Sequence, residues 1–266
     1  MTTMTTAMTG ATRDSVTMLR RSLKHMQRYP SLTLMLIGQP LLFLLLFVYV
    51  FGGTMGAGLP GGGGRDAYLA YVSPAILIMT VASVALSTAI YVAKDATEGI
   101  IDRFRTMPIA RSSVLTGHAL GALAQTALAV AVVLAVAVLL GYRPGAGVAG
   151  WLGAVGILTL LAIALTWLCV ALGLAAGSVE TASNTPMFLM ILPFISSAFV
   201  PTDSMPSGLA WVAEHQPFTP IIETLRAYLA GSNPGSDVWW AIGWCVLITV
   251  LCFSWATRLF GRVRAV

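Results

Sequence analysis

Long uncharged runs alternate with short polar segments along most of the chain. Six runs are predominantly apolar and carry no Asp, Glu, Lys or Arg in their interior: Ser31–Phe51, Ala67–Ala93, Ser112–Gly141, Ala149–Gly177, Thr185–Val200 and Val238–Thr257. A membrane-spanning helix needs about 20 such residues. The pattern therefore predicts an all-α membrane protein with six transmembrane helices. The fifth run is the shortest and contains Pro186 and Pro193, so we expect a kinked helix there.

The composition supports a membrane protein of the helical kind. The 266 residues are 57% hydrophobic and 9% charged, whereas about a quarter of the residues of a soluble domain are charged. The apolar runs are continuous, while the strands of a membrane barrel are short and alternate apolar with polar residues. The net charge of +5 does not indicate nucleic-acid binding, because the basic residues lie beside the runs.

The distribution of basic residues predicts the orientation. Five lie within residues 1–30, four in residues 94–111 and three in residues 258–266, whereas only Arg65, Arg143 and Arg226 lie on the other side. Because cytoplasmic segments of membrane proteins are enriched in Lys and Arg, we expect both termini in the cytoplasm. The predicted localisation is the bacterial plasma membrane, with six crossings of the bilayer.

This orientation divides the chain into three parts. Residues 1–30 form a cytoplasmic N-terminus, residues 31–257 form the six-span membrane domain, and residues 258–266 form a basic cytoplasmic tail. Apolar residues recur at three- and four-residue spacing between the basic residues of the first part: Val16, Leu19, Leu23 and Met26. That spacing predicts an amphipathic helix lying in the membrane surface.

The loop 94–111, KDATEGIIDRFRTMPIAR, is the most highly charged stretch of the chain. If it is helical, Glu98 and Asp102 share a face, and Pro108 ends or kinks the helix. A short amphipathic helix between the second and third spans is well placed to bind a soluble partner. A solvated loop that only links the two spans is the alternative.

The connections on the outer side differ from one another. Residues 52–66 are rich in glycine and predict a flexible loop, but no Gly-Lys-Ser/Thr sequence follows as a phosphate-binding loop requires. Residues 142–148 predict a tight turn. The longest connection, 201–236, predicts two short helices at Pro206–His215 and Pro220–Ala230. Its Trp, Phe and Tyr residues suit a membrane interface.

Two stretches carry a resemblance to a known family. Gly99–Arg105 with Met107–Arg111, and Gln216–Pro220 with Glu223 and Arg226, resemble motifs of type-2 ABC transporter permeases, in particular the daunorubicin/doxorubicin-resistance branch. The resemblance implies an N-terminal elbow helix, a cytoplasmic coupling helix in 94–111 and re-entrant extracellular helices in 201–236.

The resemblance also implies partners and site residues. A permease pair, of identical or homologous copies, encloses the pathway, and two ABC ATPase subunits bind ATP and Mg²⁺. The residues implied to contact the ATPase are Glu98, Gly99, Asp102, Arg103, Phe104, Arg105 and Pro108. The implied extracellular gate consists of Phe218, Thr219, Glu223 and Arg226.

The predicted spans contain hydroxyl and amide groups but no charge. Carriers driven by protons or sodium usually need ionisable groups near the midplane, so an external energy source is favoured. No Walker A motif is present, and the permease itself is not expected to be an enzyme. Candidate substrate-pathway residues are Thr80, Ser83, Ser87, Asn184, Phe188 and Ser196. Interhelical hydrogen bonding is the alternative role for the polar ones.

No catalytic residues and no metal site are predicted. The three Cys and three His residues have no ligand spacing. The favoured function is a permease for multidrug export, and so for antibiotic resistance, or for lipid export, carrying hydrophobic or amphipathic compounds. The alternatives are an exporter of lipid-linked glycan or wall polymer, and a membrane scaffold that binds a soluble partner without transport. An intramembrane enzyme is disfavoured because no buried nucleophile or acid pair is evident.

Overall fold

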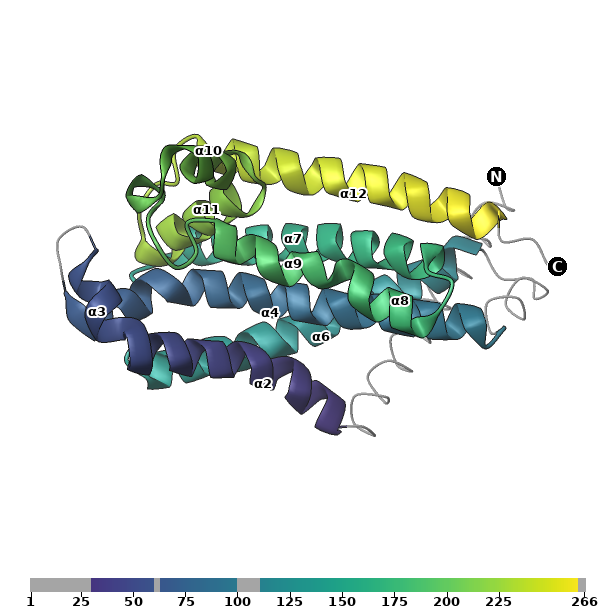
Figure 1. The fold of residues 1–266 in the computed structure, drawn as a ribbon, viewed down its shortest axis with the longest axis horizontal. Coiled ribbons are helices and arrows are strands. Elements are labelled where there is room, and N and C mark those ends of the chain that lie inside the picture. The colour runs from purple at the N-terminus through teal and green to yellow at the C-terminus, as the bar shows by residue number, and fades with distance from the viewer. Residues whose placement is uncertain (1–29, 60–62, 100–110, 263–266) are drawn as a thin grey trace.

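The computed structural model describes residues 30–59, 63–99 and 111–262, and these are helical apart from turns and short connections (Figure 1). The α-helices are α2 (Pro30–Leu46), α3 (Gly52–Ala57), α4 (Gly64–Thr97), α6 (Arg111–Leu139), α7 (Val148–Ala175), α8 (Val179–Asn184), α9 (Phe188–Ile191), α10 (Ser207–His215), α11 (Phe218–Ala230) and α12 (Asp237–Arg262). A π-helical turn, η1 (Phe47–Phe51), joins α2 to α3. The 3₁₀ turns are η2 (Thr185–Met187), η3 (Leu192–Ile195) and η4 (Thr202–Ser204).

Within the described residues, five helices are long and apolar enough to cross a membrane. They are Leu36–Ala57, Gly64–Thr97, Ala119–Leu139, Val148–Ala175 and Asp237–Phe260. These correspond to the first four predicted runs and the sixth. The chain is therefore an all-helical, multi-pass membrane protein. The amphipathic helix expected at 13–29 lies outside the described residues.

The bundle has two distinct ends (Figure 1). One end holds α10, α11 and the turn between α6 and α7, and we name it the α10–α11 end. At the opposite end α4 and α12 finish. The bounds of α10 and α11 confirm the two short helices predicted in 201–236. Gly231 ends α11 with a φ of +76°, and an added Cβ would lie 2.5 Å from the carbonyl oxygen of Gly145, so glycine is required there.

The glycine-rich stretch 52–66 is more helical than expected. The first span continues through η1 into α3, and α4 already begins at Gly64. The prediction of a loop is therefore wrong for residues 52–57 and 64–66. Glycine weakens a helix in isolation by about 1 kcal/mol relative to alanine. Here α3 packs against α4 so closely that a Cβ on Gly56 would lie 1.9 Å from the carbonyl oxygen of Gly64.

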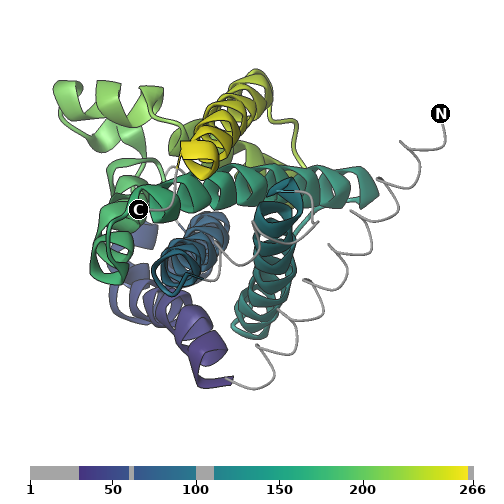
Figure 2. The same cartoon turned by 90° about the vertical axis from the view of Figure 1, so that its right-hand side faces the viewer.

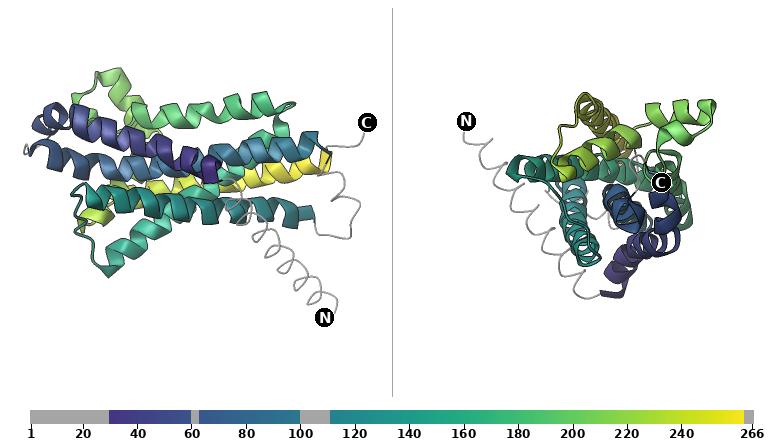
Figure 3. Two further views of the ribbon diagram at one scale, coloured as in Figure 1. Left: turned by 90° about the horizontal axis from the view of Figure 1, so that it is seen from below. Right: turned by 90° about the vertical axis from the view of Figure 1, so that its left-hand side faces the viewer.

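The fifth predicted run is not one continuous helix. It is divided into α8, η2, α9 and η3, and a proline lies in the first turn of both η2 and η3. Because proline lacks an amide hydrogen, each interrupts the helical hydrogen bonding, which confirms the expected kink. The segment 178–200 runs beside the bundle from the end where α7 finishes to the α10–α11 end (Figures 1 and 3). It is not among the five long spans, and the sixth crossing stays a prediction.

Helix α4 lies at the centre of the bundle. It contacts α2, α3, α6, α7, α8 and α11, and the end-on view shows α2, α6 and α7 around it (Figure 2). Of an 18-residue apolar stretch of α4, 83% is buried, whereas 17% of the corresponding stretch of α12 is buried. The contact with α7 is close at Gly173, where an added Cβ would lie 2.6 Å from the carbonyl oxygen of Ala89. Small residues permit such backbone approach between membrane helices.

Candidate functional site

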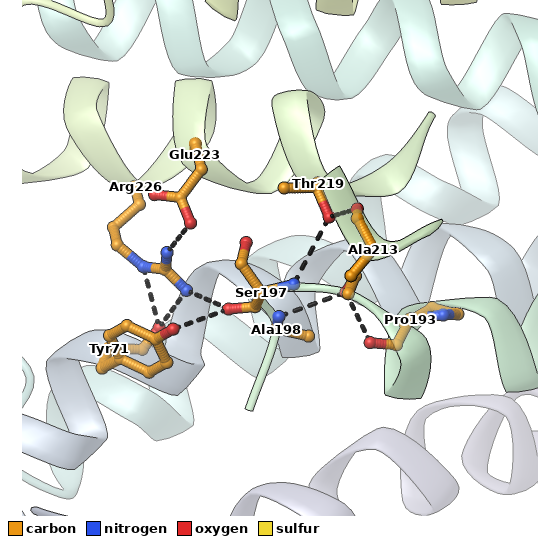
Figure 4. Close-up of polar contacts among 9 residues, drawn as sticks. Tyr71, Pro193, Ser197, Ala198, Ala213, Thr219, Glu223 and Arg226 are labelled. Carbon is orange, nitrogen blue, oxygen red and sulfur yellow. Dashed lines mark hydrogen bonds and ion pairs between the residues drawn. The ribbon is translucent and has the colours of Figure 1, made fainter. Parts of the chain in front are cut away.

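Arg226 of α11 is the centre of a polar cluster at the α10–α11 end (Figure 4). Its guanidinium donates to the backbone carbonyl of Tyr71 from Nε at 3.3 Å and from Nη2 at 3.2 Å. Nη2 also donates to the carbonyl of Ser197 at 3.0 Å. Nη1 lies 2.5 Å from a carboxylate oxygen of Glu223, one turn earlier on α11. The Arg226 side chain is 17% exposed, so this charge is largely enclosed by its partners.

Two tyrosines of α4 hold the same backbone segment. The hydroxyl of Tyr71 donates to the carbonyl of Ser197 at 2.8 Å, and that of Tyr68 donates to the carbonyl of Phe199 at 3.2 Å. The Arg226 guanidinium carbon lies 3.8 Å from the centroid of the Tyr71 ring, within cation–π range. Tyr71 thus binds Arg226 through both its ring and its carbonyl. Residues 197–199 are fixed to α4 and α11 together.

The connection before α11 completes the cluster. The hydroxyl of Thr219 donates to the carbonyl of Ala213 and lies 3.4 Å from the amide nitrogen of Ser197. The side-chain nitrogen Nε2 of Gln216 donates to the carbonyl of Leu192, at 3.2 Å, and to that of Ile195. These bonds join the broken segment 178–200 to α10 and α11. We name the group Tyr71, Ser197, Thr219, Glu223 and Arg226 the Arg226 cluster.

Buried polar atoms without a partner lie on the same elements. Among the described residues, Ser197 Oγ, Gln216 Oε1 and Thr224 Oγ1 are buried and have no hydrogen-bond partner. An unsatisfied buried polar group costs about 1–3 kcal/mol. Of these three atoms, Ser197 Oγ belongs to the Arg226 cluster, and the other two lie on residues next to it, in α11 and before it.

Tyr142, in the turn between α6 and α7, extends the electrostatic surroundings of Arg226. Burial raises the pKa of Tyr142 to about 12, although the positive charge of Arg226 acts in the opposite direction. The phenol therefore stays neutral at physiological pH. Glu223 is the residue that balances the charge of Arg226 in this region.

The structure locates all four predicted gate residues in this region. Thr219, Glu223 and Arg226 belong to the Arg226 cluster, and Phe218 is buried at the start of α11. Sequence reasoning missed Tyr71 and Ser197. Both accept from Arg226 through backbone carbonyls, which every residue possesses. Tyr71 adds its ring and hydroxyl, but its place in the sequence does not indicate that it lies next to α11.

The predicted pathway residues differ in exposure: four are buried and two are exposed. The hydroxyls of Thr80, Ser83 and Ser87 on α4 are buried and donate to carbonyls of their own helix. Ser83 also lies 3.7 Å from the sulfur of Met190 on α9. Asn184 and Phe188 are exposed instead. Ser196 is buried, donates to the carbonyl of Pro193 and accepts from the amide of Ala198.

The structure reaches only the beginning of the predicted coupling loop. Glu98 lies 3.8 Å from Lys94, and both side chains are at least half exposed, so this pair contributes about 0–1 kcal/mol. Gly99, directly after the C-cap of α4, has a φ of +69°. The remaining residues of this set lie outside the described residues: Asp102, Arg103, Phe104, Arg105 and Pro108.

A group of phenylalanines was missed by sequence reasoning. Phe43, Phe47, Phe194 and Phe199 pack together between the first span and the segment 178–200. Phe43, Phe47 and Phe51 recur at four-residue spacing, which is the available signal. Among the described residues, no three His, Cys, Asp or Glu side chains gather as metal ligands.

These features define a helical membrane protein with a polar cluster at one end of its bundle. Residues 14–230 match the ABC-2 type transporter family model, and the chain belongs to this family. It is 28% identical over 241 residues to the daunorubicin resistance ABC transporter permease protein DrrB1 of Streptomyces coeruleorubidus, covering 90% of this chain and 80% of that protein. It is 24% identical over 188 residues to the probable doxorubicin resistance ABC transporter permease protein DrrC of Mycobacterium tuberculosis, covering 71% and 68%.

Proposed function

We propose that the chain is the permease subunit of an ATP-driven exporter that moves amphipathic, largely apolar compounds out of a bacterial cell. The observation that carries the proposal is the family match along residues 14–230, together with likeness to a daunorubicin-resistance permease over 90% of the chain. A drug-like compound is the first cargo class that this likeness favours. An envelope lipid is the second.

In this proposal both termini are cytoplasmic and the α10–α11 end faces outward. The excess of basic residues in the sequence segments 1–30, 94–111 and 258–266 supports the orientation. The segment 178–200 is the fifth crossing. Its course along the bundle, from one end to the other, supports six crossings in total (Figure 1).

The loop 94–111 is proposed to bind the ATPase. Two ATPase subunits bind ATP and Mg²⁺, and a second permease copy or a homologous permease completes the exporter. Helix α4 supports this route for coupling, because it carries Tyr71 near one end and Glu98 at the other. A rigid-body movement of the loop therefore moves the backbone carbonyl that holds Arg226. Conformational coupling needs such an element with two arrangements.

The Arg226 cluster acts as the outer gate in this mechanism. In the closed state Arg226 fixes the carbonyls of Tyr71 and Ser197, which belong to different elements. Hydrogen bonds to a charged group contribute about 1.5–3 kcal/mol each. Opening exchanges these bonds for others, and the unpartnered hydroxyls and amide oxygen nearby are available for that exchange.

The cargo path follows from the chemistry of the spans. Their interiors contain no charged side chain, so a hydrated ion has no group to replace its water. Thr80, Ser83 and Ser87 have hydroxyls already satisfied by their own helix, and Met190 of α9 covers Ser83. Displacement of α8–α9 from α4 would open a neutral, weakly polar path that includes Asn184, Phe188 and Ser196.

Co-purification tests this function. The chain is expressed with a candidate ABC ATPase from the same genome, and the complex is isolated through a tag on the permease. We expect the ATPase to be retained and its activity to be stimulated by amphipathic compounds. Absence of any associated ATPase would favour the scaffold or another class of transporter.

A further inference from the structure

The first span contains a π-helical turn in its second half. Residues 47–51 form η1, which joins α2 to α3 within one continuous span. The backbone is α-helical on both sides, at Leu46 and at Gly52, whereas Phe51 has a φ of −102° and a ψ of −16°, away from regular helical values. A π turn holds one residue more than an α turn, and such turns inside α-helices are frequent at functional sites.

The additional residue keeps one face of the span buried along its length. Leu44 and Val48 are at most 1% exposed, Gly52 and Gly56 are buried as well, and α2, η1 and α3 all contact α4. These four residues follow one another in steps of four. In a regular α-helix each such step turns the face by about 40°, or about 120° over three steps. A π turn takes up one residue without its rotation of about 100°, so only about 20° remains.

The part of the span after η1 is fixed to α4. A Cβ on Gly56 would lie 1.9 Å from the carbonyl oxygen of Gly64, and a Cβ on Gly52 would lie 3.0 Å from Cγ of Arg65. These contacts leave little space for a side chain on this face, so α3 cannot turn about its axis without a clash. Any rotation within the span therefore falls on α2.

Phe47 in η1 packs against the segment that carries the gate contacts. Its ring centroid lies 4.2 Å from that of Phe199. The carbonyl of Phe199 accepts from Tyr68 of α4, and the carbonyl of Ser197 accepts from Arg226 of α11. The segment thus contacts η1 through the Phe199 ring, and α4 and α11 through its carbonyls. A movement of this segment at the gate has to be matched by η1.

We propose that η1 is a register switch for the first span, and that it is coupled to the Arg226 cluster through Phe47 and Phe199. The π turn is present while the cluster is closed. When the cluster opens, η1 becomes α-helical and α2 turns by about 100° relative to α3. This rotation carries Phe47 off Phe199 and frees residues 197–199 to move. The backbone stays hydrogen-bonded, since bonds between residues five apart are replaced by bonds between residues four apart. The inference rests on the proposed function, because it describes one step in the opening of the outer gate.

Deletion of Val50 tests the switch in the complex with its ATPase. Val50 is 63% exposed, and a span that is one residue shorter keeps the same buried face as a regular α-helix. We therefore expect a wild-type melting temperature but ATP-dependent uptake into proteoliposomes that is about ten-fold slower, because no residue is left to release. Val50→Ala keeps the residue and should transport within about two-fold of wild type. The cargo is daunorubicin or a labelled envelope lipid, whichever the wild-type complex moves.

A crosslink tests the same switch without changing the length of the span. In a cysteine-free background, Phe47→Cys and Phe199→Cys are joined by a short, cleavable thiol crosslinker. We expect about ten-fold slower uptake after crosslinking, and recovery when the linker is cleaved, because Phe47 can no longer leave Phe199. Trp167→Cys with Phe253→Cys is the control pair, since these rings lie 4.7 Å apart on α7 and α12, away from η1. Its crosslink should leave uptake unchanged.

Each outcome decides the inference. Uptake at the wild-type rate by the Val50 deletion, or by the crosslinked Phe47 and Phe199 pair, overturns the switch and leaves the exporter function standing. A lower melting temperature of the Val50 deletion also overturns it, because the buried faces then do not stay in register. Deletion of exposed Thr159 from the regular helix α7 shows how large such a loss is. If the wild-type complex retains no ATPase or moves neither cargo, the exporter function fails, and the inference with it.

Discussion

Arg226 and Tyr71 are 155 residues apart in sequence, yet Arg226 donates two hydrogen bonds to the carbonyl of Tyr71 and lies over its ring. The contact joins α11, at one end of the bundle, to the central helix α4. In the proposed mechanism the same helix leads to the ATPase-binding loop. In that mechanism the pair connects the proposed outer gate to the helix that leads to the proposed ATPase-binding loop.

Replacing Arg226 tests the gate. Arg226→Ala leaves Glu223 without its cation and removes the hydrogen bonds that the guanidinium donates to the carbonyls of Tyr71 and Ser197. We therefore expect about 2–4 kcal/mol less stability and a loss of coupled transport. Arg226→Lys should recover only part of both, because a single ammonium does not reproduce the planar fork. Thermal melting and cargo-stimulated ATPase activity are the measurements.

Arg143→Ala is the matched control for Arg226. Arg143 lies at the same end of the bundle but is exposed and donates only to the carbonyls of Val138 and Tyr142 beside it. We expect little change in melting or stimulation. If Arg143→Ala lowers the melting temperature and the stimulation as much as Arg226→Ala does, the effect is not specific to Arg226. That result would contradict its role in a gate.

Charge reversal in the loop tests the ATPase contact. In the double variant Arg103→Glu with Arg105→Glu, like charges or unpaired buried charges should cost several kcal/mol at the interface. Membrane insertion should be normal while co-purification of the ATPase is lost. Arg143→Glu is the control, because Arg143 lies in the turn between α6 and α7 at the α10–α11 end. Full retention of the ATPase and of transport by the double variant would refute the docking role.

Cysteine labelling tests the sixth crossing. In a background lacking Cys169, Cys245 and Cys252, single cysteines replace exposed Glu180 at the opposite end and exposed Ser204 at the α10–α11 end. An impermeant thiol reagent should label position 204, and also position 62, from outside intact cells. Positions 180 and 100 should react only after permeabilisation. Labelling of 180 and 204 from the same side would mean that the segment 178–200 does not cross.

Close packing of α7 on α4 predicts a large effect at one glycine. Gly173→Val places atoms against the backbone of Ala89 and should destabilise the bundle by about 1–3 kcal/mol. Gly156→Val, on the same helix with no atom within 4 Å of an added Cβ, is the control. Equal melting temperatures for the two variants would contradict the close approach of α7 to α4.

The sequence predicted features that depend on local chemistry. Long apolar runs located five spans, and Pro186 and Pro193 predicted the breaks in the segment 178–200. Features that depend on packing were missed. The helix α3 forms from glycines because α4 lies against it, and the loop expected there was wrong for this reason.

In the candidate site, too, local sequence features were predicted and features that depend on packing were missed. Glu223 and Arg226 were indicated by a motif, but their partners Tyr71 and Ser197 contribute carbonyls, whose use depends on the folded positions of distant elements. Phe47 likewise packs against Phe194 and Phe199, which lie more than 140 residues later in the chain. Spacing along one helix did not indicate the segment that packs against it.

Transport by the purified complex tests the central claim most directly. Proteoliposomes with the ATPase facing outward are given daunorubicin and, in parallel, a labelled envelope lipid, with ATP and Mg²⁺. We predict accumulation of at least one of them that requires hydrolysable ATP and is lost in the Arg103→Glu, Arg105→Glu double variant. Accumulation driven by a proton or sodium gradient without ATP, or movement of a small hydrophilic ion or sugar while neither amphiphile moves, would contradict the account.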